Sequence, residues 1–409
     1  MAGQQVHRSM LLPVYVPTLL LAFGQGVTVY TLPLYARALG GSLTVIGLAV
    51  AAAGIGTFLT DLPAGMLLSR FGGGRLMLFG TGAAGLAAVL IGLVHSMPAL
   101  VAFRVLFGIG SSLWSLSRMA YVTDAIAPAQ RGRILSTFGG VNRAGAFAGP
   151  ALGGLIAGRF GLASPFLVAG VAGLAAALMS LRVAVEKPDT GGPAGRRMRW
   201  NRVGLVLQGH SRDLAGAGSA QFFGQIIRAG RQLIVPLYAS TALGLGVEII
   251  GVIGTIAAAI DMAMFLPAGM LMDRFGRKFA SVPSFVLLSL GMASIPFVHN
   301  APELIAATTL MGFGNGLGSG SMMTLGADLA PKELIGEFLG LWRLIGDAGS
   351  SAGPIIVGSV AHAIGLSSAA VALAAIGGLS AGTMVVFVRE TLPPFTARSR
   401  AARSKPGAS

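Results

Sequence analysis

The residues of this sequence best able to do chemistry are ionisable side chains within long apolar stretches. Charge is costly away from water, so such groups usually face a partner or an aqueous cavity. A carboxylate there can bind and release a proton as its hydration changes, whereas arginine can pair with it or hold an anion. The basic members are Arg104, Arg118, Arg143, Arg228, Arg231 and Arg343, and the acidic members are Asp61, Asp261 and Asp347. This excess of arginine favours an anionic or zwitterionic ligand over a cationic one.

The elements that must position these groups are membrane-spanning helices. Hydrophobic residues make up 54% of the 409-residue chain and charged residues only 11%, whereas soluble domains carry about 25% charged residues. A helix needs about 20 mostly apolar residues to cross a bilayer. The sequence therefore predicts an all-α membrane protein of twelve spans, over 11–35, 43–69, 76–94, 98–123, 134–158, 164–185, 214–240, 247–272, 279–298, 302–328, 334–361 and 366–388.

One long hydrophilic stretch divides the spans into two sets of six. We expect an N-terminal bundle over 1–185, a cytoplasmic linker over 186–213, a C-terminal bundle over 214–392 and a disordered tail over 393–409. Within the linker, residues 202–209 are expected to form a short interfacial helix.

The loop charges predict the orientation of the chain in its membrane. Lys and Arg gather in alternate loops, and the opposite loops carry only Arg37 and Arg159. Because cytoplasmic loops are rich in Lys and Arg, both termini and the linker are expected in the cytoplasm. The same excess of Lys and Arg in cytoplasmic loops explains the net charge of +15, so no nucleic-acid partner is expected. The absence of Cys excludes disulfides and thiolate metal sites.

An internal repeat relates the two sets of spans at an offset of 204 residues. Residues 63–67 (PAGML) recur as 267–271, and 70–72 (RFG) recur as 274–276. Asp124 recurs as Asp328, Gly132 as Gly336, and Gly149-Pro150 as Gly353-Pro354. Six spans is an even number, so the halves share one orientation and are related by an axis along the membrane normal.

With these motifs the chain resembles the major facilitator superfamily of secondary transporters, over nearly its whole length. The family's loop signature after spans 2 and 8 is complete in the second half and degraded in the first, where Ser69 replaces the acidic residue. The resemblance implies a gate in which the arginines of this loop signature pair with an Asp at the end of span 4 or span 10. The alternative is that these are ordinary loop charges exposed to water. The expected gating residues are Gly65, Arg70, Gly72, Asp124, Gly269, Asp273, Arg274, Gly276, Arg277 and Asp328.

Two further patterns support the resemblance. Span 4 carries Arg104 before Gly108 and Gly110. Span 5 carries a glycine-proline pattern typical of the family's antiporters, which favours export in exchange for protons. Its residues are Gly145, Gly149, Pro150, Gly153 and Gly154. Proline removes a helical hydrogen bond, so this pattern predicts either a kink or only close packing.

The resemblance also implies which intramembrane charges meet, since spans 5 and 8, and spans 2 and 11, face each other in the family fold. Asp261 lies about 18 Å from the end of its span and Arg143 about 15 Å, at about 1.5 Å per residue, so they are expected to pair. Asp61 and Arg343 form the second candidate pair, with an Arg343–Asp347 pair within one helix as the alternative. Asp261 is the preferred candidate for the proton carrier. The alternative is that it forms a permanent structural salt bridge.

The remaining candidates concern proton coupling and the substrate cavity. Asp61, Asp347 and Arg104 are further proton-coupling candidates. Because spans 1, 4, 7 and 10 line the cavity in the family, the cavity candidates are Gln25, Arg118, Arg228, Arg231 and Asn315. Alternatively, each arginine forms an ion pair with an Asp or donates hydrogen bonds to backbone carbonyls, and none binds the substrate. Alternate glycines from Gly312 to Gly320 predict either a bending segment or a close-packing surface.

These observations together predict a transporter and not an enzyme. No Walker-type nucleotide-binding loop is present, so ATP hydrolysis is not indicated. We expect a monomer in a bacterial cytoplasmic membrane that exports a small molecule against proton influx by alternating access. The alternatives are proton-coupled uptake of an organic anion and a lipid or lysolipid flippase. The partners are the substrate, protons and the bilayer; no cofactor and no metal site are expected.

Overall fold

The structure is a computed structural model that describes residues 14–125, 128–186 and 200–391. Within these ranges the side chains at 62, 64, 65, 69, 123–136, 182–186 and 200–203 are not described. The centre of the predicted linker and the predicted tail therefore lie outside the described residues. The side chain of Asp124 is likewise not described, and for Gly65 only the helical backbone is described.

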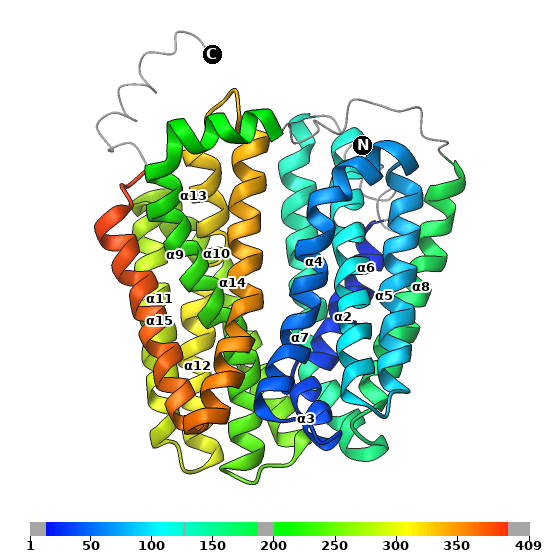
Figure 1. Ribbon diagram of the computed structural model, residues 1–409, viewed down its shortest axis with the longest axis vertical. Helices are drawn as coiled ribbons and strands as arrows, with labels where there is room; N and C mark the ends of the chain where they lie inside the picture. The colour runs from blue at the N-terminus through cyan, green and yellow to red at the C-terminus, as the bar shows by residue number, and fades with distance from the viewer. Residues whose placement is uncertain (1–13, 126–127, 187–199, 392–409) are drawn as a thin grey trace.

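The described residues form helices and no strand (Figure 1). In the first half these are α2 (Val16–Val29), α3 (Thr31–Ala38), α4 (Leu43–Phe71), α5 (Gly73–Gly92), α6 (Met97–Ala125), α7 (Pro128–Phe160) and α8 (Ser164–Glu186). In the second half they are α9 (Trp200–Thr241), α10 (Val247–Phe275), α11 (Arg277–Ser294), the 3₁₀ turn η2 (Ile295–Phe297), α12 (Ala301–Leu317), α13 (Ser321–Leu329), α14 (Ile335–Ile364) and α15 (Leu366–Phe387).

Among the described residues, eight helices are long and apolar enough to cross a bilayer, and the bent pair α2–α3 makes a ninth. The other predicted spans correspond to α7, α9 and the pair α12–α13. Arginines interrupt the apolar character of α7 and α9, and a break divides α12 from α13 into helices of 17 and 9 residues. The arrangement is therefore consistent with the twelve predicted spans, although composition alone identifies fewer.

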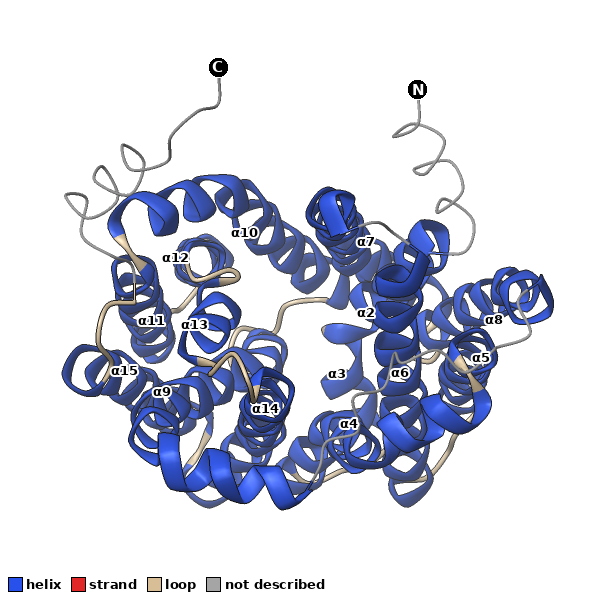
Figure 2. Ribbon diagram, turned by 90° about the horizontal axis from the view of Figure 1, so that it is seen from above, coloured by secondary structure: helices blue, strands red, loops and turns tan. Residues whose placement is uncertain are grey.

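The helices form two groups that meet along two helix pairs. Figure 2 shows α2–α8 on one side of the molecule and α9–α15 on the other. Across the boundary α7 packs against α10, and α4 packs against α14. These are the pairs that the resemblance implied, spans 5 with 8 and spans 2 with 11.

The repeat is visible in the backbone as well as in the sequence. Three turns place glycine at positive φ in both halves, where a side chain would be strained; the pairs are Gly40 and Gly244, Gly72 and Gly276, and Gly161 and Gly365. The Tyr35 hydroxyl donates to the Val94 carbonyl, and the Tyr238 hydroxyl donates to the Val298 carbonyl. The halves therefore share turns and buried hydrogen bonds.

The halves differ where α12 ends and α13 begins. Gly320 has a φ of 77°, whereas Leu116, its counterpart by the offset, lies within the continuous helix α6. Gly314 and Gly316 pack closely, and a Cβ on Gly316 would lie 2.6 Å from the Asp261 carbonyl oxygen. The glycine-rich segment therefore has both predicted features, with close packing in its first part and a helix break in its last.

The end of the linker is helical, and α9 has a kink at His210, whose φ is −131°. Figure 1 shows the first turns of α9, in green, lying across one end of the bundle before the helix turns into it. Residues 204–209 of the predicted interfacial helix lie in this part. We call this end of the molecule, where the turns at Gly72 and Gly276 lie, the signature end, and the other the opposite end.

Candidate functional site

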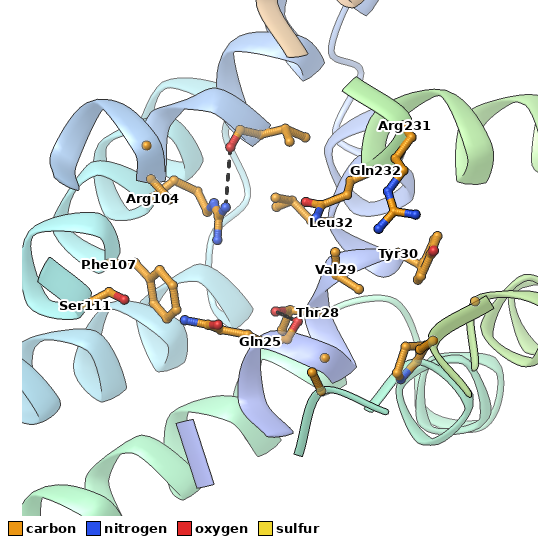
Figure 3. A pocket seen from close by; sticks show the side chains of 18 of the residues that line it. Gln25, Thr28, Val29, Tyr30, Leu32, Arg104, Phe107, Ser111, Arg231 and Gln232 are labelled. Carbon is orange, nitrogen blue, oxygen red and sulfur yellow. Dashed lines mark hydrogen bonds between the residues drawn. The ribbon is translucent and has the colours of Figure 1, made fainter. Parts of the chain in front are cut away.

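A cavity of about 430 Å³ lies between the two halves. Its walls come from α2, α3, α4, α6 and α7 of the first half and from α9 and α10 of the second. Figure 3 shows Arg104 and Arg231 entering from opposite sides, with Gln25 and Thr28 near the floor in that view. The cavity also reaches Asp261 and the Pro150 position of α7. Residues of both halves therefore line the cavity.

The cavity lining contains two arginines, Arg104 and Arg231, and one carboxylate, Asp261, among the described residues. Arg104 donates weakly to the carbonyls of Ala49 and Val50, at 3.4 and 3.5 Å, and its guanidinium lies 5.4 Å from the Phe107 ring centroid. Among the described residues, no ion pair within 4.0 Å involves Arg104 or Arg231. Two guanidinium groups with free donors are suited to hold an anion.

A second cavity of about 210 Å³ lies beside the first, in the N-terminal half. The two share Gln25, Phe107 and Ser111 in their walls. Arg118 lies in the second cavity, with its guanidinium 3.8 Å from the Phe138 ring centroid and 5.4 Å from that of Trp114. Such contacts stabilise a cation without neutralising it, so Arg118 adds a third positive charge to the two adjacent cavities.

Two of the expected cavity residues lie elsewhere. Arg228 faces into the C-terminal half, where it donates to the Gly318 carbonyl at 3.3 Å and lies over Phe285. Asn315 donates its amide to Asp261 at 3.1 Å. Neither is among the residues that line the cavity between the halves. The break before α13 explains the position of Arg228, because it exposes a carbonyl that the guanidinium can reach. Of the five candidates, Gln25, Arg118 and Arg231 line a cavity.

Arg143 and Asp261 meet across the boundary between α7 and α10. Arg143 Nη1 lies 3.4 Å from Asp261 Oδ1, and both side chains are about one-quarter exposed. Arg143 also contacts the Ser319 hydroxyl, and its guanidinium lies 4.4 Å from the Phe265 ring centroid. The pair therefore links the halves beside the cavity.

A three-residue cluster links α4 to α14 on the other side. Arg343 Nε lies 2.7 Å from Asp61 Oδ2 and 3.6 Å from Asp347 Oδ2. The Ser112 hydroxyl donates to Asp61 Oδ1 at 2.5 Å. Both partners considered for Arg343 are therefore present, one across the boundary and one within its own helix. We call these three residues the acid-pair cluster.

Backbone contacts close the boundary toward the opposite end. Gly47 of α4 packs on Gly358 of α14, and a Cβ on Gly47 would lie 3.1 Å from Gly358 Cα. Gly251 of α10 packs on Gly154 of α7, with a corresponding separation of 3.0 Å. The Ala151 amide also donates to Thr255 at 2.8 Å across this boundary. The ribbons of α4 and α14 diverge toward the signature end (Figure 1).

The antiporter-type pattern of α7 serves two surfaces. Gly145, Gly149 and Gly153 face α2, where a Cβ on Gly145 would lie 2.8 Å from the Leu19 carbonyl oxygen. Gly154 faces the other half through α10. The helix is continuous through Pro150, and the glycines of the pattern form a packing surface on both sides.

At the signature end, the second copy of the loop signature pairs with the predicted acidic residue, Asp328, through Arg277. Arg277 Nε lies 2.8 Å from Asp328 Oδ2, and its Nη1 lies 3.8 Å from Asp273 Oδ1. Arg274 is exposed, with its guanidinium over Phe275. The second copy of the signature therefore forms an ion-pair network. For the first copy, the side chain of Asp124 is not described, so its pairing stays a prediction.

Glu390, which follows the last helix, caps α11. Its carboxylate accepts from the amides of Arg277 and Lys278, both at 3.0 Å. A carboxylate at a helix N-terminus satisfies free amides and opposes the helix dipole. The segment that follows α15 is thereby connected to the turn at Gly276.

Glu390→Ala is expected to lower the free energy of unfolding by about 0.5–2 kcal/mol, as the loss of a helix cap does. The measurement is a thermal-unfolding scan of the purified protein in detergent. Arg389→Ala removes the neighbouring exposed side chain and serves as the control. Equal melting temperatures for the two variants would contradict this role of Glu390.

The sequence profile of the Major Facilitator Superfamily matches residues 15–224 and again 217–408. The chain belongs to the major facilitator superfamily. It is therefore a multi-pass membrane transporter, and the two profile matches reflect the repeat.

Similar proteins include transporters of several kinds. An uncharacterized MFS-type transporter of Methanocaldococcus jannaschii is 22% identical over 87% of this chain and 92% of its own length. A multi-drug resistance efflux pump PmrA homolog of Lactococcus lactis is 24% identical over 66% of this chain and 67% of its own.

Solved structures share the fold. A bacterial homolog of the human lysosomal transporter Spinster, in an inward-facing and occupied conformation, has a TM-score of 0.77 at 15% identity, covering 93% of this chain and 96% of that one. The nucleoside transporter NupG has a TM-score of 0.73 at 13% identity, covering 92% and 99%.

Proposed function

We propose that this transporter exports a small organic anion or zwitterion from a bacterial cytoplasm in exchange for protons. The observation that carries the proposal is the cavity between the halves, which combines Arg104 and Arg231 with the carboxylate of Asp261. Similarity to a multi-drug efflux pump homolog supports the direction. The antiporter-type glycine pattern of α7, whose Gly154 packs on α10 at the boundary between the halves, supports exchange.

The proposed cycle rocks the two halves about the cavity. Backbone contacts at Gly47 and Gly251 hold the opposite end together in the conformation described. With both termini in the cytoplasm, as the loop charges favour, this conformation would open inward. Reversal requires the glycine contacts to separate and the halves to meet at the signature end. The Arg143–Asp261 pair and the acid-pair cluster lie along the two boundaries that must rearrange.

The direct test is transport by the purified protein in proteoliposomes with an imposed pH gradient. Candidate substrates come from a thermal-shift screen of anionic and zwitterionic metabolites and drugs. Antiport predicts that a compound moves opposite to the protons and stops moving when a protonophore removes the gradient. Movement in the same direction as protons would establish uptake instead. Transfer of a fluorescent lipid between leaflets, with no soluble substrate moved, would establish a flippase.

Arg104→Gln and Arg118→Gln are each expected to weaken the binding of an anionic substrate by roughly 10–100-fold. The basis is that a hydrogen bond to a charged group contributes about 1.5–3 kcal/mol and that 1.4 kcal/mol is tenfold in affinity. The measurement is a binding titration with a carboxylate found in the screen and with its methyl ester. Arg37→Gln changes an exposed arginine at the opposite end and serves as the control. Equal effects on the acid and its ester would contradict an anion-binding role.

A further inference from the structure

The acid-pair cluster has a feature that the Arg143–Asp261 pair lacks, namely carboxylate oxygens with no hydrogen-bond donor. Asp61 Oδ2 and Asp347 Oδ2 are both buried and accept no hydrogen bond among the described residues. Asp261 has donors at both oxygens, from Arg143 and Asn315. A buried carboxylate oxygen without a donor is costly.

The two unsatisfied oxygens face the same group and each other. Both lie near Arg343 Nε, at 2.7 and 3.6 Å, and the two carboxyl groups are within hydrogen-bonding reach. One guanidinium thus serves two carboxylates, which leaves one negative charge in the cluster. A single proton on either carboxyl would donate to the other, satisfy both oxygens and remove that charge. Paired carboxylates that share a proton in this way titrate as a unit.

We infer that Asp61 and Asp347 share one proton across the boundary between the halves, and that this is the coupling proton. The inference rests on the proposed proton coupling and specifies its site. It replaces Asp261, the carrier favoured by the sequence, because both oxygens of Asp261 already accept hydrogen bonds, from Arg143 and Asn315. Asp261 then serves as a bridge.

The surroundings of the cluster are consistent with one titrating proton. From α6, Ser112 donates to Asp61, and Arg118 interacts electrostatically with Arg343. From α9, Gln221 and Gln225 lie near Gly346 of α14 and carry no charge. Arg343 is thus the charged group that contacts both carboxyl groups among the described residues. One cation balances one ionised carboxylate, which leaves the other to bind the proton.

Sharing couples the proton to the conformation, because Asp61 belongs to α4 and Asp347 to α14. With the proton bound, the carboxyl groups attract and hold α4 against α14. When the proton leaves to water, two carboxylates face each other and repel, which favours separation of this boundary. Acid conditions therefore favour the conformation described, and alkaline conditions favour the other.

The test is infrared spectroscopy of the purified full-length protein, which needs no substrate. At neutral pH the wild type is expected to show the carbonyl stretching band of one protonated, buried carboxylic acid. Asp347→Asn and Asp61→Asn are each expected to abolish this band, and Asp347→Glu to retain it at a shifted frequency. Asp261→Asn, which changes an intramembrane Asp whose oxygens both have donors, is expected to leave it unchanged.

Two results would overturn the inference: a band that survives in both Asp61→Asn and Asp347→Asn, or a band lost only in Asp261→Asn. Asn supplies an amide donor to the remaining carboxylate, so these variants are expected to fold, and the thermal-unfolding scan verifies this. Transport assays separate the two proposals. A shared proton without gradient-driven transport would overturn the proposed exchange, and with it the coupling role of the proton, but not the sharing of the proton by Asp61 and Asp347. Gradient-driven transport retained in Asp347→Asn would overturn the coupling role of the pair alone.

Discussion

Gly358→Leu is expected to abolish transport and to hold the two halves apart at the opposite end. A Cβ at this position would lie 2.5 Å from the Leu43 carbonyl oxygen and 3.0 Å from Gly47 Cα. Both neighbours are backbone atoms of α4, which cannot rotate away as a side chain can. Because packed interfaces are bistable and not continuously deformable, α4 and α14 must separate, and the conformation closed at this end is lost.

The measurement is a distance distribution between spin labels at the opposite end. The sequence contains no cysteine, so Ala38→Cys and Ala242→Cys can be labelled with no background. Both positions are exposed and are related by the repeat. The distribution is expected to move to longer distances in Gly358→Leu, and transport in proteoliposomes is expected to fall by at least a hundredfold.

The matched control is Gly378→Leu, since a Cβ at Gly378 on α15 would meet no atom within 4 Å. It adds the same side chain to a helix of the same half and is expected to change neither measurement. An unchanged distance distribution in Gly358→Leu would show that the contact with Gly47 does not hold this end closed.

Much of the fold followed from the sequence because it rests on periodic, local signals. Long apolar stretches gave the spans, and the 204-residue offset implied that the halves share one architecture. The positive-φ turn at Gly72 and its counterpart at Gly276 fall within the repeated motif. The same offset relates Gly47 to Gly251, so the two glycine contacts at the opposite end carried a sequence signal that the prediction did not use.

The candidate site was less predictable because it depends on side-chain direction and on helix breaks. Depth along a span brought Arg143 near Asp261, and the structure places them together. The position of Arg228 depends on the carbonyl exposed by the break at Gly318–Gly320, which the glycine pattern indicated only as one alternative. Ser112 and Ser319 contact the buried charges, but single serines in apolar helices gave no signal.

Arg143→Gln is expected to shift the balance between conformations by about 1–3 kcal/mol, the cost of leaving a partly buried charged group without its partner. In the variant, Asp261 keeps Asn315 as a donor but loses its only ion pair among the described residues. Since 1.4 kcal/mol is a factor of ten, the ratio of the two conformations is expected to change by roughly 5–150-fold. The spin-label pair at Ala38 and Ala242 reports these populations.

The double variant Arg143→Gln with Asp261→Asn isolates the interaction itself. It removes both charges, so neither remains buried without a partner, and its populations are expected to lie closer to wild type than those of either single variant. The exposed pair His299–Glu303 provides the control cycle. With side chains 79% and 46% exposed, it is expected to show a coupling energy near zero.

The same cycle distinguishes a switching bridge from a permanent one. A pair that forms in only one conformation lowers the free energy of that conformation alone, so its loss moves the distance distribution. A pair kept throughout the cycle stabilises both conformations equally, so its loss lowers the melting temperature and leaves the distribution in place. Because the pair crosses the boundary between α7 and α10 beside the shared cavity, we expect the distribution to move.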